Sequence, residues 1–252
     1  MALLECVPNF SDGHDPLVAA ELQAAIRATP GVRLLDWHSD RDHDRSVATM
    51  VGDPPALEAA AFAAIACAAR VIDLTRQSGV HPRIGAADVC PFVALAPADR
   101  PRAIESAHAL GRRVGSELGL PVYFYGEAAL RAERVALPDV RRGGFEGLAR
   151  AAREDPARRP DAGPAHLDPR AGAVAIGARG FLVAFNIELA SADLAAARAI
   201  AREVRESSGG LPGVRALGLA LASRGIVQVS LNLCAPERTG LLAVFDAVER
   251  VL

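Results

Sequence analysis

The sequence predicts an α+β protein built from two ferredoxin-like (split βαβ) subdomains, each an open mixed sheet with helices on one face. Three observations support this prediction. The first half reads β-α-β-β-α-β-α-β, the second half reads β-α-β-β-α, and a Pro/Gly-rich stretch separates them. At 252 residues the chain also exceeds the common size of a single domain. We expect residues 1–170 to form the first subdomain and residues 171–252 a second, truncated one.

Apolar patterns and turn residues define the elements of the first half. Short apolar runs bounded by turn residues predict strands, and longer runs with apolar residues at helical spacing predict helices. Asp15 before Pro16 is typical of a helix N-cap followed by a first-turn proline, and Pro30-Gly31 ends that helix. The predicted strands are 3–7, 32–37, 46–51, 89–95 and 121–125, and the predicted helices are 17–28, 54–74 and 98–118.

A charged stretch with many prolines and glycines, residues 131–159, follows and contains one short helix near 145–153. Residues 156–169 include four prolines and little apolar content, which predicts a linker or a long functional loop. The second half then has a strand at 181–187, a helix capped by Ser191 that runs to about 206, hairpin strands at 214–221 and 226–233, and a helix capped by Thr239 that runs to 252.

Composition excludes several classes of function. The net charge of −2 gives no indication of binding to nucleic acid or to an anionic membrane. All 28 basic residues are arginines, which excludes a catalytic lysine. No signal peptide and no apolar span of about 20 residues is visible, so we expect a soluble, cytoplasmic protein. The cysteines are far apart and in apolar contexts, which predicts buried free thiols at Cys6, Cys67, Cys90 and Cys234.

The segment 78–92 has the strongest chemical signal. His81 lies between Gly79 and Pro82, and Pro82 biases it towards an extended backbone. Arg83 follows, and Asp88 opens an apolar run that predicts a buried strand. An imidazole on a stiff loop beside a strand is suited to general acid/base catalysis, although a surface His-Pro turn is an equal alternative on local chemistry alone.

Three further clusters contain residues with possible chemistry. The segment 38–45 holds histidines and aspartates, which could indicate a metal site, but its spacing matches no metal pattern and a polar hairpin loop explains it. Tyr123, Tyr125 and Glu127 end an apolar strand and are typical of a core or a pocket wall. The glycine-rich segment 163–172 precedes a strand rather than a helix, so it is neither a Rossmann fingerprint nor a P-loop. It either covers a ligand or joins two domains.

Arginines in predicted loops form a common feature of these clusters, and three of the four lie beside glycine or proline. A guanidinium group pairs well with a carboxylate, so together they suit a ligand with several carboxylates, whereas any single one is more simply a surface arginine. These residues are Arg45, Arg83, Arg170 and Arg179.

A series of motifs runs in order along nearly the whole chain, and the most specific is 81–92, HPRIGAADVCPF. The others are 5–11, 34–36, 43–47, 121–129, Leu137-Pro138 with Arg141, Asp161 with Gly163-Pro164, 177–179 and 184–187. Together they resemble the formiminotransferase family. This resemblance implies two α/β subdomains with the ligand in the groove between them, and a homodimer.

The resemblance also implies transfer of a formimino group between N-formimidoyl-glutamate and tetrahydrofolate in histidine breakdown. Tetrahydrofolate would be the co-substrate, and no metal is required. His81 matches the acid/base histidine. We assign substrate binding to His38, Arg45, Arg83, Tyr125 and Arg179. The stretch that matches the family's folate-contacting segment is Gly163, Pro164, Ala165, His166, Leu167, Asp168, Pro169, Arg170, Ala171 and Gly172.

Two departures from the family pattern lead to further expectations. Asp44 stands where an amide side chain is expected, and its carboxylate could pair with Arg45 and weaken the hold of Arg45 on an anionic substrate. Compared with the family pattern, we expect the second subdomain to lack a final strand and helix, which would leave an edge for a partner to cover. The alternatives to an active transferase are an enzyme with a different donor, a non-catalytic folate-binding or partner-binding protein, and, more remotely, a metal-dependent hydrolase.

Overall fold

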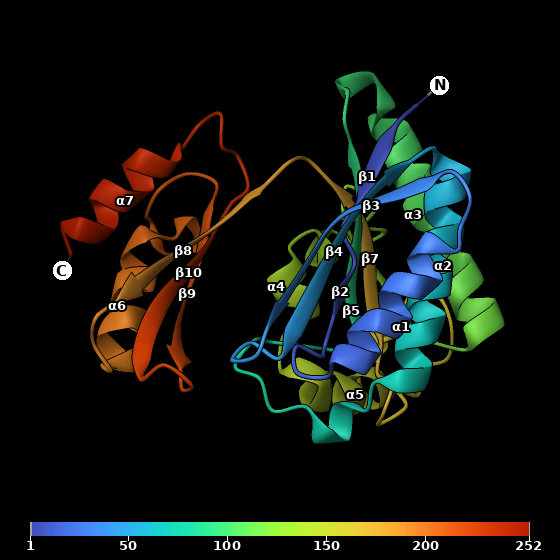
Figure 1. The fold of residues 1–252 in the computed structure, drawn as a ribbon, viewed down its shortest axis with the longest axis horizontal. Helices are drawn as coiled ribbons and strands as arrows, with labels where there is room; N and C mark the ends of the chain where they lie inside the picture. The colour runs from blue at the N-terminus through green and yellow to red at the C-terminus, as the bar shows by residue number, and fades with distance from the viewer. Residues whose placement is uncertain (1, 252) are drawn as a thin grey trace. The chain divides into compact units, whose positions relative to one another are not determined.

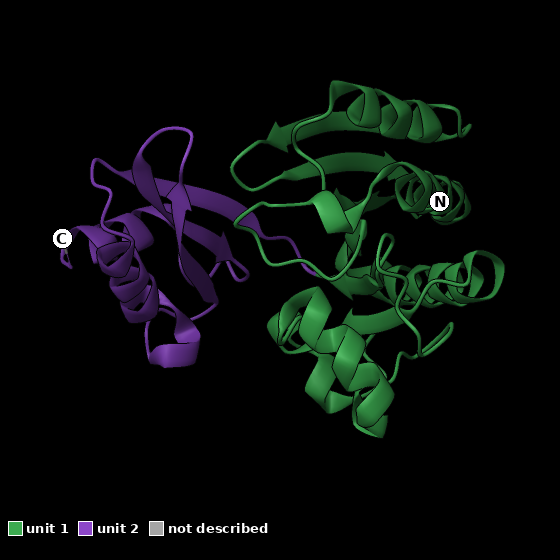
Figure 2. Cartoon of the chain, turned by 90° about the horizontal axis from the view of Figure 1, so that it is seen from below, with its two compact units in different colours: residues 1–179 green, residues 180–252 purple. Residues whose placement is uncertain are grey.

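The computed structural model describes residues 2–251, and the chain divides into two compact units, Met1–Arg179 and Gly180–Leu252 (Figure 1, Figure 2). The predicted boundary between residues 170 and 171 is therefore too early. Strand β7 (Val174–Arg179) lies beyond that boundary, but it pairs with two strands of the first unit.

Unit 1 contains one mixed sheet. Its remaining strands are β1 (Leu4–Cys6), β2 (Asn9–Phe10), β3 (Val32–Asp40), β4 (Arg45–Gly52), β5 (Ala87–Ala94) and β6 (Val122–Gly126). The short strands β1 and β2 both pair with β4 on one side and β5 on the other, so they act as one interrupted strand. The sheet order is therefore β3-β4-β1/β2-β5-β7-β6. Its first four positions have the split βαβ arrangement that the sequence predicts, and β7 and β6 extend it by parallel pairing.

Helices cover the two faces of this sheet unequally. One face packs against α1 (Pro16–Arg27), α2 (Pro54–Val71) and α3 (Arg100–Arg113). The opposite face packs, near β5, β6 and β7, against α4 (Leu137–Val140) and α5 (Gly144–Glu154) (Figure 1). The prediction of helices on one face is therefore incomplete for unit 1. Alternate residues of β4, from Arg45 to Val51, lie on this opposite face and are only half-buried.

The sequence prediction missed β2 and β7 for different reasons. Strand β2 is two residues long and lies in a segment rich in turn-forming residues. Half of strand β7 is alanine and glycine, which have low strand propensity, yet five of its six residues are buried, and the strand lies between β5 and β6. Helix α2 is long and apolar enough in composition to cross a membrane, but seven of its residues are buried in the core of unit 1.

Unit 2 is a smaller α+β unit. Its elements are β8 (Val183–Leu189), α6 (Leu194–Val204), β9 (Val214–Leu221), β10 (Ile226–Leu233) and α7 (Leu241–Glu249). Strand β10 lies between β8 and β9, which confirms the split βαβ prediction. Asp193 rather than Ser191 caps α6, and Gly240 rather than Thr239 precedes α7. The Thr239 hydroxyl instead donates to the Pro212 carbonyl at 2.7 Å.

Candidate active site

A β-bulge in β5 directs the side chain of Asp88 to the face of the unit 1 sheet that α4 and α5 cover only in part. Asn9 pairs with Val89 and Phe10 with Ala87, so Asp88 is the extra residue between them. Ala87 belongs to the core under α1 to α3, whereas Val89 belongs to the opposite core under α4 and α5. Asp88 is fully buried, and a buried carboxylate requires partners.

Two arginines from different elements meet the Asp88 carboxylate. The Arg45 guanidinium, at the start of β4, donates to Asp88 Oδ2 at 2.8 Å. Arg141, which follows α4, donates to the same oxygen. The other oxygen, Oδ1, accepts from the Ile84 backbone N–H at 2.9 Å, which ties the loop that contains His81 to the cluster. Asn9 accepts from Arg45 Nε at 3.0 Å and fixes the orientation of that guanidinium.

The cluster carries more positive than negative charge. Burial alone would raise the pKa of Asp88, but Arg141 and Arg45 lower it to about 2. Burial lowers the pKa of Arg45 to about 10, partly offset by Asp88, so Arg45 remains protonated near neutral pH. Two guanidinium groups therefore face one carboxylate. The Nε of Arg141 is buried and has no hydrogen-bond partner among residues 2–251. Such an excess of buried positive charge is suited to an anionic ligand.

Arg141 is held by its neighbours rather than by a long helix. Helix α4 has one turn, and Arg158 donates to the carbonyls of Asp139 and Val140 at 2.8 and 3.1 Å. These bonds add side-chain donors to carbonyls at the end of the helix. Val140 is buried in the core under α5, so the backbone from which Arg141 projects is fixed.

His81 is partly buried beside this cluster. Its Nδ1 lies 2.8 Å from the Pro82 carbonyl oxygen, an acceptor, so Nδ1 carries the proton and Nε2 is the basic nitrogen of the neutral ring. Burial, together with the positive charges of Arg45 and Arg141, holds the pKa of His81 well below its ordinary value, and Asp88 offsets part of this effect. His81 is therefore a neutral base near pH 7.

Asp44 does not pair with Arg45, so the expected weakening of Arg45 is wrong. Arg45 pairs with Asp88 and Asn9 instead. The Asp44 carboxylate accepts from Gly13 N–H at 2.9 Å and from Ser78 N–H at 3.3 Å, and it lies 2.8 Å from His14 Nδ1. Its backbone φ of +47° lies in the left-handed region.

Arg83 and His38 lie outside the Asp88 cluster. The Arg83 guanidinium contacts Glu146 of α5 at 3.4 Å and the Leu74 carbonyl at 3.5 Å, so it anchors the His81 loop to neighbouring elements. His38 is exposed on the outer strand β3 and pairs with Val47. Asp40 pairs with Arg45 in the same register. Paired residues point to the same face of a sheet, as do residues two apart on a strand, so His38 and Arg45 lie on one face.

Tyr125 and Arg179 lie along the same face, towards the carboxyl ends of β6 and β7. Burial raises the pKa of Tyr125 to about 12, although Arg179 and Arg141 oppose the rise, so the phenol stays protonated. The Tyr125 ring covers Gly177, where an added Cβ would lie 2.6 Å from ring carbons. Glu5 shares this face and is half-buried. Burial raises the pKa of Glu5, and the charge of Arg179 opposes the rise.

The segment 163–172 reaches the site through its backbone. Ala86 N–H donates to the Ala171 carbonyl, and Ala173 N–H donates to the Ile84 carbonyl, both at 2.9 Å. The two segments lie so close together that a Cβ on Gly85 would be 1.8 Å from the Ala173 carbonyl oxygen. Leu167 is buried under α5, whereas residues 163–166 and 168–170 are exposed.

Within this segment, the polar side chains mostly contact nearby groups. Asp168 accepts from Arg170 and Ala171 N–H at 2.8 and 2.9 Å and closes a local turn. His166 lies 2.8 Å from Arg153, and Arg170 lies 3.1 Å from Asp73. The exposed part of the segment is therefore held at both ends and is accessible between them.

The sequence prediction of site residues missed three members of the central cluster: Asn9, Asp88 and Arg141. All three lie in the motifs quoted above, so a signal was present. Asp88 had the clearest one, because an aspartate that enters an apolar run must be buried with a partner. Among residues 2–251, no group of three or more His, Cys, Asp or Glu side chains is arranged to hold a metal ion.

The chain matches known proteins of one family. The model of the formiminotransferase domain, N-terminal subdomain, matches residues 3–179, and that of the formiminotransferase domain matches residues 184–251. The chain is 40% identical over 247 residues to a glutamate formimidoyltransferase of Streptococcus pyogenes serotype M1, covering 98% of this chain and 82% of that protein. It is 41% identical over 250 residues to a glutamate formimidoyltransferase of Thermoplasma acidophilum, with the same coverage.

A longer relative gives the same result. The chain is 42% identical over 252 residues to a formimidoyltransferase-cyclodeaminase of Gallus gallus, and it spans 46% of that protein. An α/β protein with these matches over nearly its whole length is an enzyme of the class that transfers one-carbon groups. The chain belongs to the formiminotransferase family.

Proposed function

We propose that this protein transfers a formimino group between N-formimidoyl-L-glutamate and tetrahydrofolate, with His81 as general acid/base, as a step of histidine degradation. The observation that carries the proposal is the state of His81. Its Nδ1–H donates to the Pro82 carbonyl, its Nε2 is the basic nitrogen, and burial together with the adjacent positive charges lowers its pKa and keeps it neutral. The names of the relatives support the choice of substrates.

The chemistry requires one group that accepts and then returns a proton. The amine of tetrahydrofolate attacks the formimino carbon and gives a tetrahedral adduct with an extra proton on the attacking nitrogen. His81 Nε2 takes this proton and becomes imidazolium. It then gives the proton to the glutamate nitrogen, the carbon–nitrogen bond to glutamate breaks, and neutral His81 is restored. Such proton transfer typically contributes about 10²–10⁴ in rate.

Arg45 and Arg141 are suited to a carboxylate of the substrates. Asp88 neutralises one of the two charges and holds both side chains in place. A substrate carboxylate would meet the remaining charge through a bidentate contact, which a guanidinium forms better than an ammonium group. We assign Arg179 and Tyr125, along the same face, to the far end of a substrate, and His38 to its rim.

The segment 163–172 is the proposed folate contact. Its ends are fixed by backbone hydrogen bonds and by buried Leu167, and its middle is exposed. A ligand could therefore be covered by this segment without repacking the core. Arg83 anchors the His81 loop to α5 through its contact with Glu146. We further propose that the protein acts in the cytoplasm as a homodimer and needs no metal.

The test is release of glutamate from N-formimidoyl-L-glutamate by the purified protein, with and without tetrahydrofolate. Folate-dependent release is the expected result. Folate binding by calorimetry without release would contradict the transfer and favour a different donor or a binding role. Release that needs no folate but stops after chelation would favour a metal-dependent hydrolase instead.

A further inference from the structure

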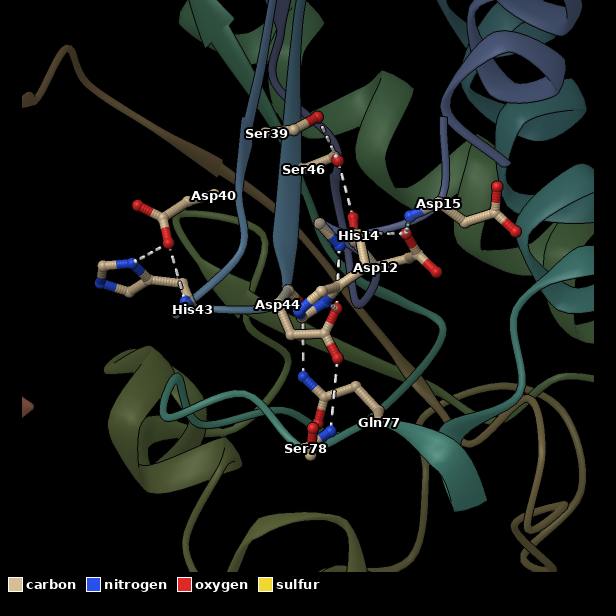
Figure 3. A network of polar contacts seen from close by, with 11 residues as sticks. Asp12, His14, Asp15, Ser39, Asp40, His43, Asp44, Ser46, Gln77 and Ser78 are labelled. Carbon is tan, nitrogen blue, oxygen red and sulfur yellow. Dashed lines mark hydrogen bonds and ion pairs between the residues drawn. The ribbon is translucent and has the colours of Figure 1, made fainter. Parts of the chain in front are cut away.

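The turn between β3 and β4 holds a carboxylate that the proposed chemistry does not use. Asp44 is 6% exposed and is the one non-glycine residue with positive φ, +47°, among residues 2–251. Its side chain joins three segments that are far apart in the sequence, the loop before α1, its own turn and the loop that leads to His81 (Figure 3). A left-handed backbone at a buried aspartate is uncommon and is usually held by its surroundings.

On one side, Asp44 and its turn hold the segment 77–80. The Ser78 N–H donates to Asp44 Oδ2 at 3.3 Å, and Gln77 Nε2 donates to the Asp44 carbonyl at 3.2 Å (Figure 3). The Val80 N–H donates to the Asp42 carbonyl at 3.1 Å. Between them, Gly79 lies against the turn so closely that a Cβ there would be 2.1 Å from the His43 carbonyl oxygen.

On the other side, Asp44 Oδ1 accepts from the Gly13 N–H at 2.9 Å and lies 2.8 Å from His14 Nδ1. Gly13 is also confined, because a Cβ there would lie 2.1 Å from the Asp40 carbonyl oxygen. Donors from two loops therefore share one buried carboxylate, and the next residue along the chain is Arg45 of the central cluster.

These contacts set where His81 lies relative to the cluster. His81 directly follows the held segment, and Asp88 fixes the other side of the same loop through Ile84. The main charges that act on the pKa of His81 are those of Arg45, Arg141 and Asp88. Asp44 thus influences His81 through the position of the loop rather than through its charge.

We propose that Asp44 is a positioning residue for His81, which latches the segment 77–80 to the β3–β4 turn without touching substrate. This inference rests on the proposed function for its kinetic consequence, but the latch itself is a property of the free protein. A displacement of about 1 Å in a catalytic group can lower the rate about 10²-fold, so a loose latch should affect kcat more than KM.

The experiment compares Asp44→Gly, Asp44→Asn and a control, Asp12→Asn. Glycine and asparagine both accept positive φ, so neither substitution adds the strain that alanine would. Asparagine keeps one acceptor oxygen and glycine keeps none. Asp12 belongs to the same polar network, but its carboxylate accepts from His14 and Asp15 N–H (Figure 3) and, among residues 2–251, makes no hydrogen bond to 77–81.

We expect Asp44→Gly to lower kcat about tenfold or more with KM values for both substrates within about twofold, because only placement is lost. Asp44→Asn should recover most of kcat, and Asp12→Asn should match the wild type. Amide hydrogen exchange at Ser78 and Val80 should accelerate in Asp44→Gly only. Unchanged kcat in Asp44→Gly, or equal losses of kcat in the glycine and asparagine variants, would overturn the positioning role.

Hydrogen exchange separates this inference from the proposed function. If the wild type does not transfer a formimino group, the proposed function fails, and selective acceleration at Ser78 and Val80 still supports the latch. Unchanged exchange at both amides in Asp44→Gly would overturn the latch whatever the activity.

Discussion

Two loops of unit 1 meet beside the central cluster, and they are held in place by different means. The loop 77–86 is fixed by charged side chains, Asp44 at one end and Asp88 at the other. The segment 163–172 is fixed by backbone hydrogen bonds and by one apolar anchor, Leu167. The first arrangement holds His81, the proposed acid/base group, within narrow limits, whereas the second leaves exposed residues that can adjust to a ligand. Substitutions that loosen the loop 77–86 should therefore affect kcat, and substitutions in the segment 163–172 should affect KM.

The largest effect is expected from Asp88→Asn. It leaves two buried guanidinium groups without their counter-charge, which typically costs about 3–5 kcal/mol in the free energy of unfolding. Turnover should fall below detection because Arg45, Arg141 and the His81 loop all lose their common partner. Urea unfolding and the glutamate-release assay measure these two quantities.

Asp88→Asn should also change how stability depends on pH. The pKa of Asp88 is about 2 in the folded protein against 3.8 ordinarily. This difference corresponds to about 2 kcal/mol of stability that is present above pH 4 and lost as pH falls through 2. The variant should lack this part of the acid transition, and an unchanged transition would show that Asp88 is not strongly paired.

The next largest effect is expected where the two loops touch. Gly85→Ala places a methyl group against the Ala173 carbonyl and should destabilise the protein by about 1–3 kcal/mol or more. Gly180→Ala is the matched control, because an added Cβ there meets nothing within 4 Å, and its stability should change by less than about 0.5 kcal/mol. Equal midpoints of thermal unfolding for both variants would show that the loops are not in close contact.

A smaller and more specific effect is expected from Arg141→Gln. Arg141 lowers the pKa of His81, so its removal should raise that pKa. The proposed mechanism requires neutral His81, so activity should be lost as pH falls through its pKa, and the acid limb of the kcat/KM profile should move to higher pH. Arg83→Gln is the control, since Arg83 pairs with Glu146 and is not among the main charges that act on His81. A shift of the limb in both variants would contradict the assignment.

The smallest effect is expected from His166→Ala in the other loop. It removes one exposed contact with Arg153, and a hydrogen bond of this kind is worth about 0.5–1.5 kcal/mol. KM for tetrahydrofolate should rise a few-fold while kcat stays within about twofold. A large fall in kcat would mean that the segment 163–172 takes part in positioning His81.

The sequence allowed the fold to be predicted where local patterns are strong. The apolar runs of β4, β9 and β10 and the Asp15-Pro16 cap of α1 produced nearly correct elements, and the split βαβ order is confirmed in both units. Strand β7 was missed because half of its residues are alanine or glycine, which have low strand propensity, and the strand is stabilised by pairing with β5 and β6.

The site was predictable only in part. His81 lies near the charge of Arg45, whereas Arg83 contacts Glu146. The reason is that a bulge in β5 and the positive φ of Asp44 decide which side chains meet, and neither can be read from residue spacing. The proximity of Arg141 to Asp88, 53 residues apart in the sequence, depends on packing of α4 against the sheet.

The most direct test of the central claim is single-site removal of the imidazole in His81→Ala, with turnover and folate affinity measured on the same preparation. We predict that kcat falls by about 10²–10⁴ while the dissociation constant for tetrahydrofolate changes by less than about threefold, because the proposed role of His81 is to move protons and not to hold the folate. Turnover at the wild-type level in this variant, with folate binding intact, would contradict the claim that His81 is the acid/base group.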